Sequence, residues 1–214
     1  MAKFERVKQD KHIVLIGYSG HSFVVLEIFR AMGRTVSAYC ELSEKEHNPY
    51  NLDYAGNENE ARVIEQLKAA DCFVSIGDNQ LRRKSYEKAD AAALSIINAI
   101  HPSAIISETA TFGNGVMVAA GVIVNAQSRI GNGVICNTGS IIEHECRIAD
   151  FAHIAPGAVL CGNVSVGEGS FIGANSVIRQ GITIGKNVLI GAGTVVTKDV
   201  PDNSRLIGNP QRPL

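Results

Sequence analysis

A group of polar side chains that can take part in acid–base chemistry lies near the middle of this chain. Asn137 is followed by Glu143, His144 and Glu145, and His153 comes nine residues after His144. A histidine beside a carboxylate has a fixed tautomer and a raised basicity, which suit a general base that works near neutral pH. We therefore expect His144 to be a base supported by Glu145. The alternative is that the two histidines only line a subunit interface.

A repeat of six residues has to position these side chains. From Ile106 to Val196 every sixth residue is apolar, without a slip or an insertion. A helix and a strand repeat at shorter intervals, so this pattern indicates short strands separated by turns. It predicts a hexapeptide β-helix, a triangular prism with about eighteen residues in each coil. Glycines that directly follow inward residues, such as Gly131 and Gly173, are expected where a side chain would crowd the corner or forbid the backbone dihedrals.

The spacing of the two histidines bears on how they can act together. His144 and His153 are half a coil apart, so within one chain they are expected on opposite sides of the prism, both pointing outward. They cannot share a metal ion in that arrangement, and we expect no metal site. If both serve one active site, they come from neighbouring subunits, and three prisms around an axis would make three such sites.

The first half of the chain has a different pattern. Buried strands are expected at residues 12–16, 35–39, 72–76 and 95–98, and helices at 24–32, 58–69 and 81–92. Residues 42–56 are expected to form a loop, either alone or with one short strand. This alternation predicts a small Rossmann-like parallel sheet with helices. Ligands of such sheets lie at the carboxyl ends of the strands, which carry Gly17 to His21, Glu41, and Gly77 to Asn79.

These strand ends suit a nucleotide. Backbone N–H groups of the first turn would hold phosphate, and an acidic side chain past the second strand could accept a hydrogen bond from a ribose or a base. Ser22 and Phe23 occupy the place of the last glycine of a dinucleotide motif, so one nucleoside diphosphate fits better than NAD. The alternative is that Gly17 and Gly20 merely permit a tight turn.

Composition narrows the class of protein. We expect two domains, residues 1–100 and 101–214, the second ending in a C-terminal segment. The net charge is −1 and Lys and Arg do not cluster, so neither nucleic acid nor a membrane is an expected partner. No apolar run is long enough to span a membrane, which predicts a soluble cytoplasmic protein. The five cysteines are scattered and are expected to be reduced.

Several segments resemble a known family. The segment from Asn137 to Cys146, His153 and Ala155-Pro156-Gly157 resemble the sugar-nucleotide N-acetyltransferases of bacterial glycan synthesis and their sialic acid O-acetyltransferase relatives. The same resemblance extends over nearly the whole chain through Tyr18-Ser19-Gly20-His21, Ile76-Gly77-Asp78-Asn79, His101-Pro102-Ser103 and Gly208-Asn209-Pro210. It implies a left-handed β-helix, a homotrimer with active sites between subunits, and acetyl transfer from acetyl-CoA to an amine of a nucleotide-linked sugar, often a 4-amino-4,6-dideoxyhexose.

The resemblance also implies roles for individual residues. His144 matches the general base and Glu145 the carboxylate that tunes it. Acetyl-CoA binding is implied for Asn137, His153, Gly162, Ala174 and Ala192. Nucleotide-sugar binding is implied for Ser19, Gly20, His21, Cys40, Glu41 and Gly77, and the strand ends add Asp78 and Asn79. The family usually carries an aspartate pair after the second strand, and here it is Cys40-Glu41, which leaves the nucleobase open.

Other functions fit the same residues. A sugar O-acetyltransferase of the sialic acid type would use the same His-Glu pair on a hydroxyl. A non-catalytic β-helix scaffold would be expected to lack that pair. Acyl transfer through Cys146 or Cys161 is disfavoured because neither has the adjacent histidine that an activated thiolate needs.

Overall fold

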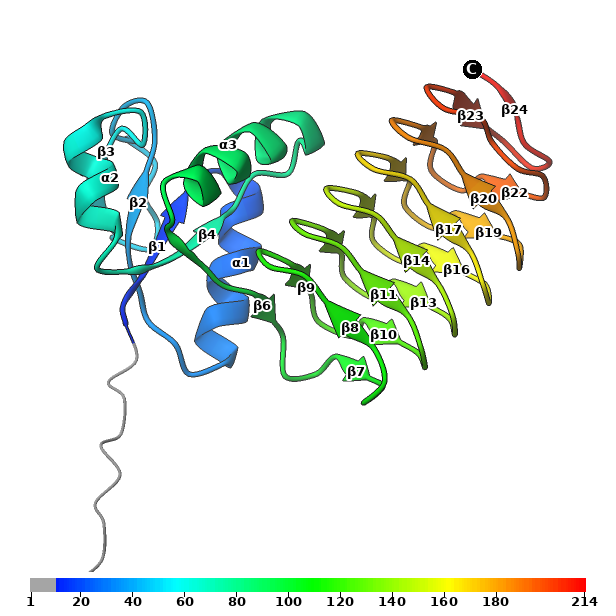
Figure 1. The fold of residues 1–214 in the computed structure, drawn as a ribbon, viewed down its shortest axis with the longest axis horizontal. Coiled ribbons are helices and arrows are strands. Elements are labelled where there is room, and N and C mark those ends of the chain that lie inside the picture. Colours follow the sequence, from blue (N-terminus) through cyan, green and yellow to red (C-terminus); the bar gives the residue numbers. More distant parts are fainter. Residues whose placement is uncertain (1–10) are drawn as a thin grey trace, which may run out of the picture.

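The computed structural model describes residues 11–214 and begins with a five-stranded sheet in the order β3-β2-β1-β4-β5, all pairs parallel. The strands are β1 (Ile13–Ile16), β2 (Val36–Cys40), β3 (Asp53–Gly56), β4 (Asp71–Val74) and β5 (Ser95–Ile96). The helices are α1 (Gly20–Ala31), α2 (Ala61–Leu67) and α3 (Asn79–Ala91). The prediction of a parallel sheet with helices is confirmed, including a short strand in the expected loop (Figure 1).

The two faces of this sheet are covered by different helices. Helix α1 lies between the sheet and β6 (Ala99–Ile100), the first strand of the next unit, while α2 and α3 share a separate core on the other face with Val14 and Cys72. Gly33 ends α1 as expected: with a φ of +73° it lets its own N–H bond Arg30 O and the N–H of Arg34 bond Phe29 O.

A triangular prism follows, built from strands of two residues and one strand of three. Its first face consists of β6, β9 (Met117–Val118), β12 (Ile135–Cys136), β15 (His153–Ile154), β18 (Phe171–Ile172), β21 (Leu189–Ile190), β23 (Arg205–Ile207) and β24 (Arg212–Pro213). The second face consists of β7 (Ile105–Ile106), β10 (Ile123–Val124), β13 (Ile141–Ile142), β16 (Val159–Leu160), β19 (Val177–Ile178) and β22 (Val195–Val196). The third face consists of β8 (Thr111–Phe112), β11 (Arg129–Ile130), β14 (Arg147–Ile148), β17 (Ser165–Val166) and β20 (Thr183–Ile184).

The expected register of six is confirmed in this left-handed β-helix, whose coils stack in Figure 1. Ile142, Leu160 and Ile178 stack inward on the second face and are fully buried. Burial of each such side chain stabilises the folded state by about 1.5 to 3 kcal/mol. The corner glycines are needed because successive coils approach closely. A Cβ on Gly131 would lie 2.7 Å from Asp150 N, and one on Gly173 would lie 2.5 Å from Ile190 O. Neither glycine has a positive φ, so crowding, and not the dihedrals, selects glycine there.

Three edges join the faces, and we name them for the argument below. The first edge lies between the first and second faces, the second edge between the second and third, and the third edge between the third and first. The change from open sheet to prism falls between β5 and β6, so the coils begin slightly before residue 101. The division into domains 1–100 and 101–214 stays a prediction, since the two units share one continuous core.

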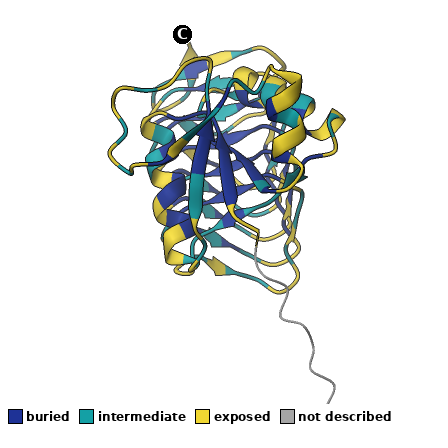
Figure 2. Cartoon of the chain, turned by 90° about the vertical axis from the view of Figure 1, so that its left-hand side faces the viewer, coloured by how far each residue is buried: buried dark blue, intermediate teal, exposed yellow. Residues whose placement is uncertain are grey.

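Side chains of α3 fasten the sheet unit to the prism. Asn79 Nδ2 donates to Gly169 O at 2.9 Å, and Arg83 forms an ion pair with Glu168. Arg82 lies between them and is only 1% exposed. The view in Figure 2 shows the buried strands of the sheet in front of the stacked coils. Within residues 11–214 no helix has the length and apolar character of a membrane span.

Candidate active site

A pocket of about 620 Å³ opens at the carboxyl ends of the parallel strands. It lies at the point where the strand order reverses between β1 and β4, which is where ligands of such sheets bind. Of the expected nucleotide-sugar residues, the pocket is lined by Ser19, Glu41, Gly77 and Asp78. Gly17 is required at its floor, because its φ is +96° and a Cβ would lie 2.7 Å from Ile76 Cγ1.

Other expected nucleotide-sugar residues lie elsewhere in the structure. Cys40 is completely buried in the core, and burial raises the pKa of its thiol to about 12. Asn79 contacts the prism, where its side chain donates to Gly169 O. His21 points from the start of α1 toward the prism, where its ring lies 6.5 Å from that of His153. Gly20 forms the start of α1 and does not line the pocket. Their roles in nucleotide-sugar binding stay predictions.

His144 lies on the second edge, in the turn after β13, with its side chain 59% exposed. Its Nδ1 is 3.1 Å from Glu145 Oε2. Because a carboxylate only accepts hydrogen bonds, Nδ1 carries the proton and Nε2 keeps its lone pair. A groove of about 310 Å³ on this edge is lined by His144, Gly162, Asn163, Gln180 and Gly181. Glu145 thus fixes the tautomer of the ring, and the general-base role of His144 stays a prediction.

The backbone of Glu145 is left-handed, like that of Gln127 at the equivalent position one coil earlier. Its φ is +61°, in the left-handed region that most side chains avoid. The equivalent position one coil later is Asn163, with φ +55°, and one coil beyond that is Gly181. Asparagine and glycine tolerate this conformation well, whereas glutamate does not. Glu145 therefore holds a strained turn position that places its carboxylate beside the imidazole.

Gly162 lies one coil beyond His144 and leaves room for its ring. A Cβ there would lie 2.5 Å from both Cε1 and Nε2 of His144. We expect Gly162→Ala to leave the melting temperature nearly unchanged, because the exposed ring can swing away. The same swing should lower kcat about 10- to 100-fold, since a displacement near 1 Å costs about that much. Thermal melts and steady-state kinetics on the same sample check this, and an unchanged kcat would show that this ring position is not the catalytic one.

The residues expected to bind acetyl-CoA fall into two places. Gly162 is on the second edge with His144, whereas Asn137, Ala174 and Ala192 are in turns along the first edge, after β12, β18 and β21. Within one chain the first and second edges flank the second face and are separated by its width. The structure therefore brings only Gly162 of these residues beside His144 in a single protomer, and the roles of all of them stay predictions.

His153 is on the first face and lies beneath the sheet unit. It points out of the prism, as expected, but it is only 8% exposed because His21 and Phe171 pack against it. Asn137 Oδ1 accepts from the Thr138 N–H at 2.8 Å, so the amide nitrogen of Asn137 faces His153 Nε2 at 3.2 Å. The buried Nδ1 lies toward the backbone of Gly77 without a close hydrogen bond. Spacing alone could not show that the sheet unit covers this ring.

His153, which is buried, and His21, which is half-buried, both favour the neutral form. Burial, together with the nearby Arg82 guanidinium, lowers the pKa of His21 to about 4 and that of His153 to about 3. In the unfolded chain both would titrate near the ordinary value of about 6.5. The unfolded state therefore binds more protons below that pH, and stability present above pH 6.5 is lost as the pH falls toward 4.

We expect this loss to be measurable as a slope. Each histidine should contribute about 1.4 kcal/mol of unfolding free energy per pH unit between pH 6 and 4. Denaturant titrations at several pH values should give a shallower slope for His153→Gln than for the parent protein. The exposed His12 serves as control, and His12→Gln should leave the slope unchanged. Equal slopes in all three proteins would contradict the burial of neutral His153.

Sequence reasoning missed two groups near these sites. Lys84, Ser85 and Lys88 on α3 line the pocket at the strand ends. Their spacing indicates that they share one face of the helix, but it does not indicate what that face contacts. Arg82 was missed because an arginine in a polar helix ordinarily faces solvent. Among residues 11–214 no cluster of three or more histidine, cysteine or acidic side chains is arranged to hold a metal ion.

Comparisons with known proteins agree with this architecture. A family model described as the PglD N-terminal domain matches residues 12–89, and one described as the hexapeptide repeat of succinyl-transferase matches residues 163–198. UDP-N-acetylbacillosamine N-acetyltransferase of Bacillus subtilis (strain 168) is 33% identical over 112 residues, which are 51% of this chain. The match spans about half of that relative's length, 52%.

Solved structures match over much more of the chain. A variant of perosamine N-acetyltransferase from Caulobacter crescentus, in complex with CoA and GDP-perosamine, is 39% identical with a TM-score of 0.90 and covers 95% of this chain and 96% of its own. The acetyltransferase domain of PglB from Neisseria gonorrhoeae FA1090, in complex with acetyl coenzyme A, is 34% identical with a TM-score of 0.89 and covers 96% of this chain and 100% of its own.

A Rossmann-like unit on a left-handed hexapeptide β-helix, with a His-Glu pair at a prism edge, defines an acyltransferase of the hexapeptide-repeat class. Within that class, the chain belongs to the nucleotide-sugar N-acetyltransferases.

Proposed function

We propose that this protein transfers an acetyl group from acetyl-CoA to the amine of a nucleotide-linked amino sugar, a 4-amino-4,6-dideoxyhexose, in bacterial glycan synthesis. The observation that carries the proposal is the His144–Glu145 pair, held at 3.1 Å on an open groove, in a chain that also has a nucleotide-sized pocket. The related perosamine enzyme, whose structure holds CoA and GDP-perosamine, supports the same reaction. A cytoplasmic location is part of this proposal, since both substrates are cytoplasmic metabolites.

The chemistry we assign to the chain's own residues is short. The sugar amine attacks the thioester carbonyl while His144 Nε2 removes its proton, and Glu145 stabilises the imidazolium that forms. A backbone N–H on the groove stabilises the oxyanion as the thiolate of CoA leaves. Cys146 takes no part: burial raises the pKa of its thiol to about 11, so this thiol is not an activated nucleophile.

We further propose a homotrimer in which the second face of each prism lies toward the threefold axis. The outward positions of that face are all branched and apolar: Ile105, Ile123, Ile141, Val159, Val177 and Val195. Ile105 is 66% exposed and Val177 is 36% exposed in the single chain. An apolar stripe of this length favours burial against copies of itself.

This arrangement would complete the active site. Around a threefold axis, the second edge of one prism lies beside the first edge of the next. His144 and Glu145 of one subunit would then face Asn137, Ala174 and Ala192 of its neighbour. The neighbour's sheet unit, which sits on its own first face, would supply the nucleotide-linked amine. A single protomer lacks this combination.

Mixed trimers test the sharing of the site. His144→Ala removes the base, and Ser85→Trp fills the nucleotide pocket from α3 without touching the prism. Each variant alone should be inactive. Co-expression in equal amounts should restore about a quarter of the parent activity. A site is then active only when the subunit that supplies His144 is the Ser85→Trp variant and the subunit that supplies the pocket is the His144→Ala variant. Recovery of no activity would show that base and pocket belong to the same subunit.

A CoA-release assay tests the reaction itself. Acetyl-CoA is offered with GDP-, UDP- and dTDP-linked 4-amino-4,6-dideoxy sugars, and with free sialic acid as contrast. Turnover on a nucleotide-linked amine supports the proposal. Turnover on sialic acid alone would establish a sugar O-acetyltransferase instead, and no turnover on any acceptor would favour a non-catalytic scaffold.

A further inference from the structure

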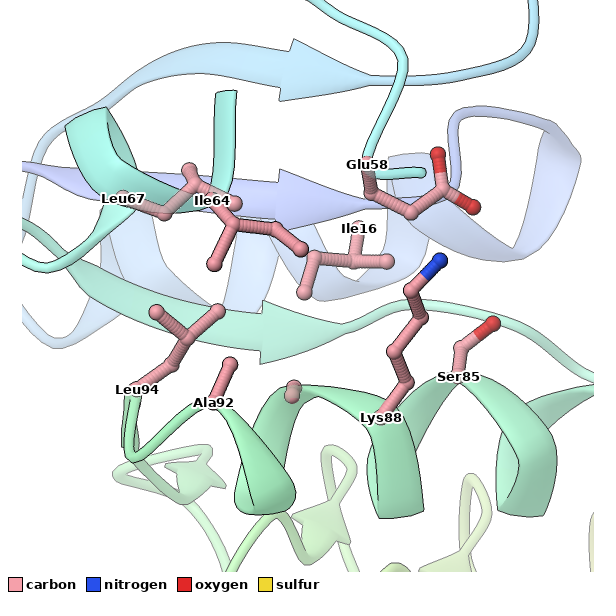
Figure 3. A pocket seen from close by; sticks show the side chains of 9 residues that line it. Ile16, Glu58, Ile64, Leu67, Ser85, Lys88, Ala92 and Leu94 are labelled. Carbon is pink, nitrogen blue, oxygen red and sulfur yellow. The ribbon is translucent and has the colours of Figure 1, made fainter. Parts of the chain in front are cut away.

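One wall of the nucleotide pocket carries two carboxylates. Glu41 follows β2, and Glu58 follows β3, the edge strand. Figure 3, a close view of an adjoining apolar cavity that Glu58, Ser85 and Lys88 also line, shows the Glu58 carboxylate above α3, across from Lys88 and Ser85. The opposite end of the pocket is formed by Gly17, Ser19 and Gly77, next to the start of α1.

The two carboxylates differ in what they bind within the chain. Glu41 Oε1 accepts from the Tyr18 N–H at 2.9 Å, and its Oε2 lies 3.5 Å from Lys45 Nζ. Glu58 Oε2 is withdrawn from solvent and has no hydrogen-bond partner. The Lys88 ammonium donates to Asn59 Oδ1, and it makes no hydrogen bond to this oxygen. A buried acceptor without a donor is costly to the protein. Because Glu58 lines the pocket, a ligand donor that meets this oxygen after a small rotation of the side chain would remove that cost.

The strand order fixes which part of a nucleotide reaches Glu58. Phosphates belong at the glycine turn after β1 and the first turn of α1. From β1, the sheet continues through β2 to β3, and two strand spacings are roughly 10 Å. That is about the reach from the phosphates of a nucleotide to the outer edge of its base. Glu58 therefore faces the base, and the sugar extends the other way, from Gly77 toward the prism.

The bases differ in what they offer to a carboxylate. Guanine presents N1–H and the N2 amino group side by side, two donors that match the two oxygens of a carboxylate. Uracil and thymine present a single N3–H between two carbonyl oxygens, which would repel it. Adenine presents an acceptor beside its amino group. Ser85 and Lys88, across the pocket, are donors suited to the O6 of guanine.

We propose that Glu58 binds the N1–H and N2 amino groups of guanine and makes GDP the preferred carrier of the sugar. The inference rests on the proposed function, because it takes the pocket to hold a nucleoside diphosphate. Glu58 is then the residue that determines nucleotide specificity. It follows the third strand, whereas the aspartate pair usual in the family follows the second.

Calorimetric titration of the full chain with free nucleotides tests this without any acetyl transfer. GDP, IDP, which lacks the 2-amino group, and UDP are titrated into the parent protein, Glu58→Gln and Glu60→Gln. Glu60 is the matched control, because it is exposed and pairs with Arg62 outside the pocket. The parent protein should bind GDP about 10- to 100-fold more tightly than IDP or UDP. Glu58→Gln should lose most of that preference, and Glu60→Gln should keep it.

The outcomes are separable. UDP binding as tight as GDP binding in the parent protein, or an unchanged GDP preference in Glu58→Gln of parent-like melting temperature, overturns the inference. GDP selectivity that depends on Glu58, in a protein that transfers no acetyl group, upholds the inference and refutes the proposed function. Acetyl transfer to a UDP-linked amine alone upholds the proposed function and overturns the inference.

Discussion

His144→Ala is expected to lower kcat by about 100- to 10,000-fold, the range typical of a lost general base. The His144 ring is exposed on the second edge, and its Nε2 is the atom free to take a proton. The affinity for CoA should change little, because the ring is not expected to carry the binding of the nucleotide end of CoA. Steady-state kinetics and calorimetric titration with CoA measure the two quantities.

Glu145→Gln is the matched variant for this experiment. The amide keeps the shape of the side chain and can still accept from His144 Nδ1, but it does not stabilise an imidazolium by charge. We expect a smaller loss of kcat than in His144→Ala. Near-normal turnover of His144→Ala would refute the assignment of the base, whatever the effect of the glutamate.

Arg82→Ala is expected to lower the free energy of unfolding by about 3 to 5 kcal/mol. Arg82 Nε donates to Gly133 O at 2.7 Å, Nη2 to Phe151 O at 2.9 Å and Nη1 to Gly77 O at 2.9 Å. It thereby joins α3 to the third edge of the prism. Burial lowers the pKa of its guanidinium to about 10, so it remains charged at neutral pH. Removing it leaves buried carbonyl groups without donors.

The neighbouring arginine provides the control. Arg83 is 49% exposed and pairs with Glu87 and Glu168, so Arg83→Ala should cost less than about 1 kcal/mol. Urea unfolding of both variants gives the comparison. Equal losses for Arg82→Ala and Arg83→Ala would show that Arg82 does not hold the two units together.

The prism could be predicted in detail because its determinant is local in sequence. One inward residue in every six, with glycine where coils approach, fixes strand, turn and face together. The first coil shows the limit of the prediction. Ile100 continues the register six residues before Ile106, so the signal for an earlier start was present, although Pro102 and the adjacent loop residues obscured it.

Helix starts were predicted less well, since apolar spacing reports the core-facing residues and not the first turn. Helix α3 begins at Asn79, ahead of the expected Leu81, because Asp78 accepts from the N–H groups of Gln80 and Leu81. An aspartate before a helical pattern is a recognisable cap. The sequence analysis assigned Asp78 only to nucleotide binding, and in the structure it caps α3 while also lining the pocket.

The site could be predicted only where neighbours in sequence are neighbours in space. His144 and Glu145 are adjacent, and Gly162 is one coil away, so their proximity followed from the repeat. The burial of His153 and Arg82 depends on how the sheet unit docks on the first face, which no local pattern encodes. The unsatisfied oxygen of Glu58 likewise depends on where β3 ends relative to α3.

The most direct test of the account is to identify the acetylated product. The protein is incubated with acetyl-CoA carrying a ¹³C-labelled acetyl group and a GDP-linked 4-amino-4,6-dideoxyhexose, and the product is examined by mass spectrometry and NMR before and after hydroxylamine treatment. We predict a labelled amide on the sugar nitrogen that survives hydroxylamine and is absent with His144→Ala. A hydroxylamine-labile ester, or label transfer that persists in His144→Ala, would contradict the account.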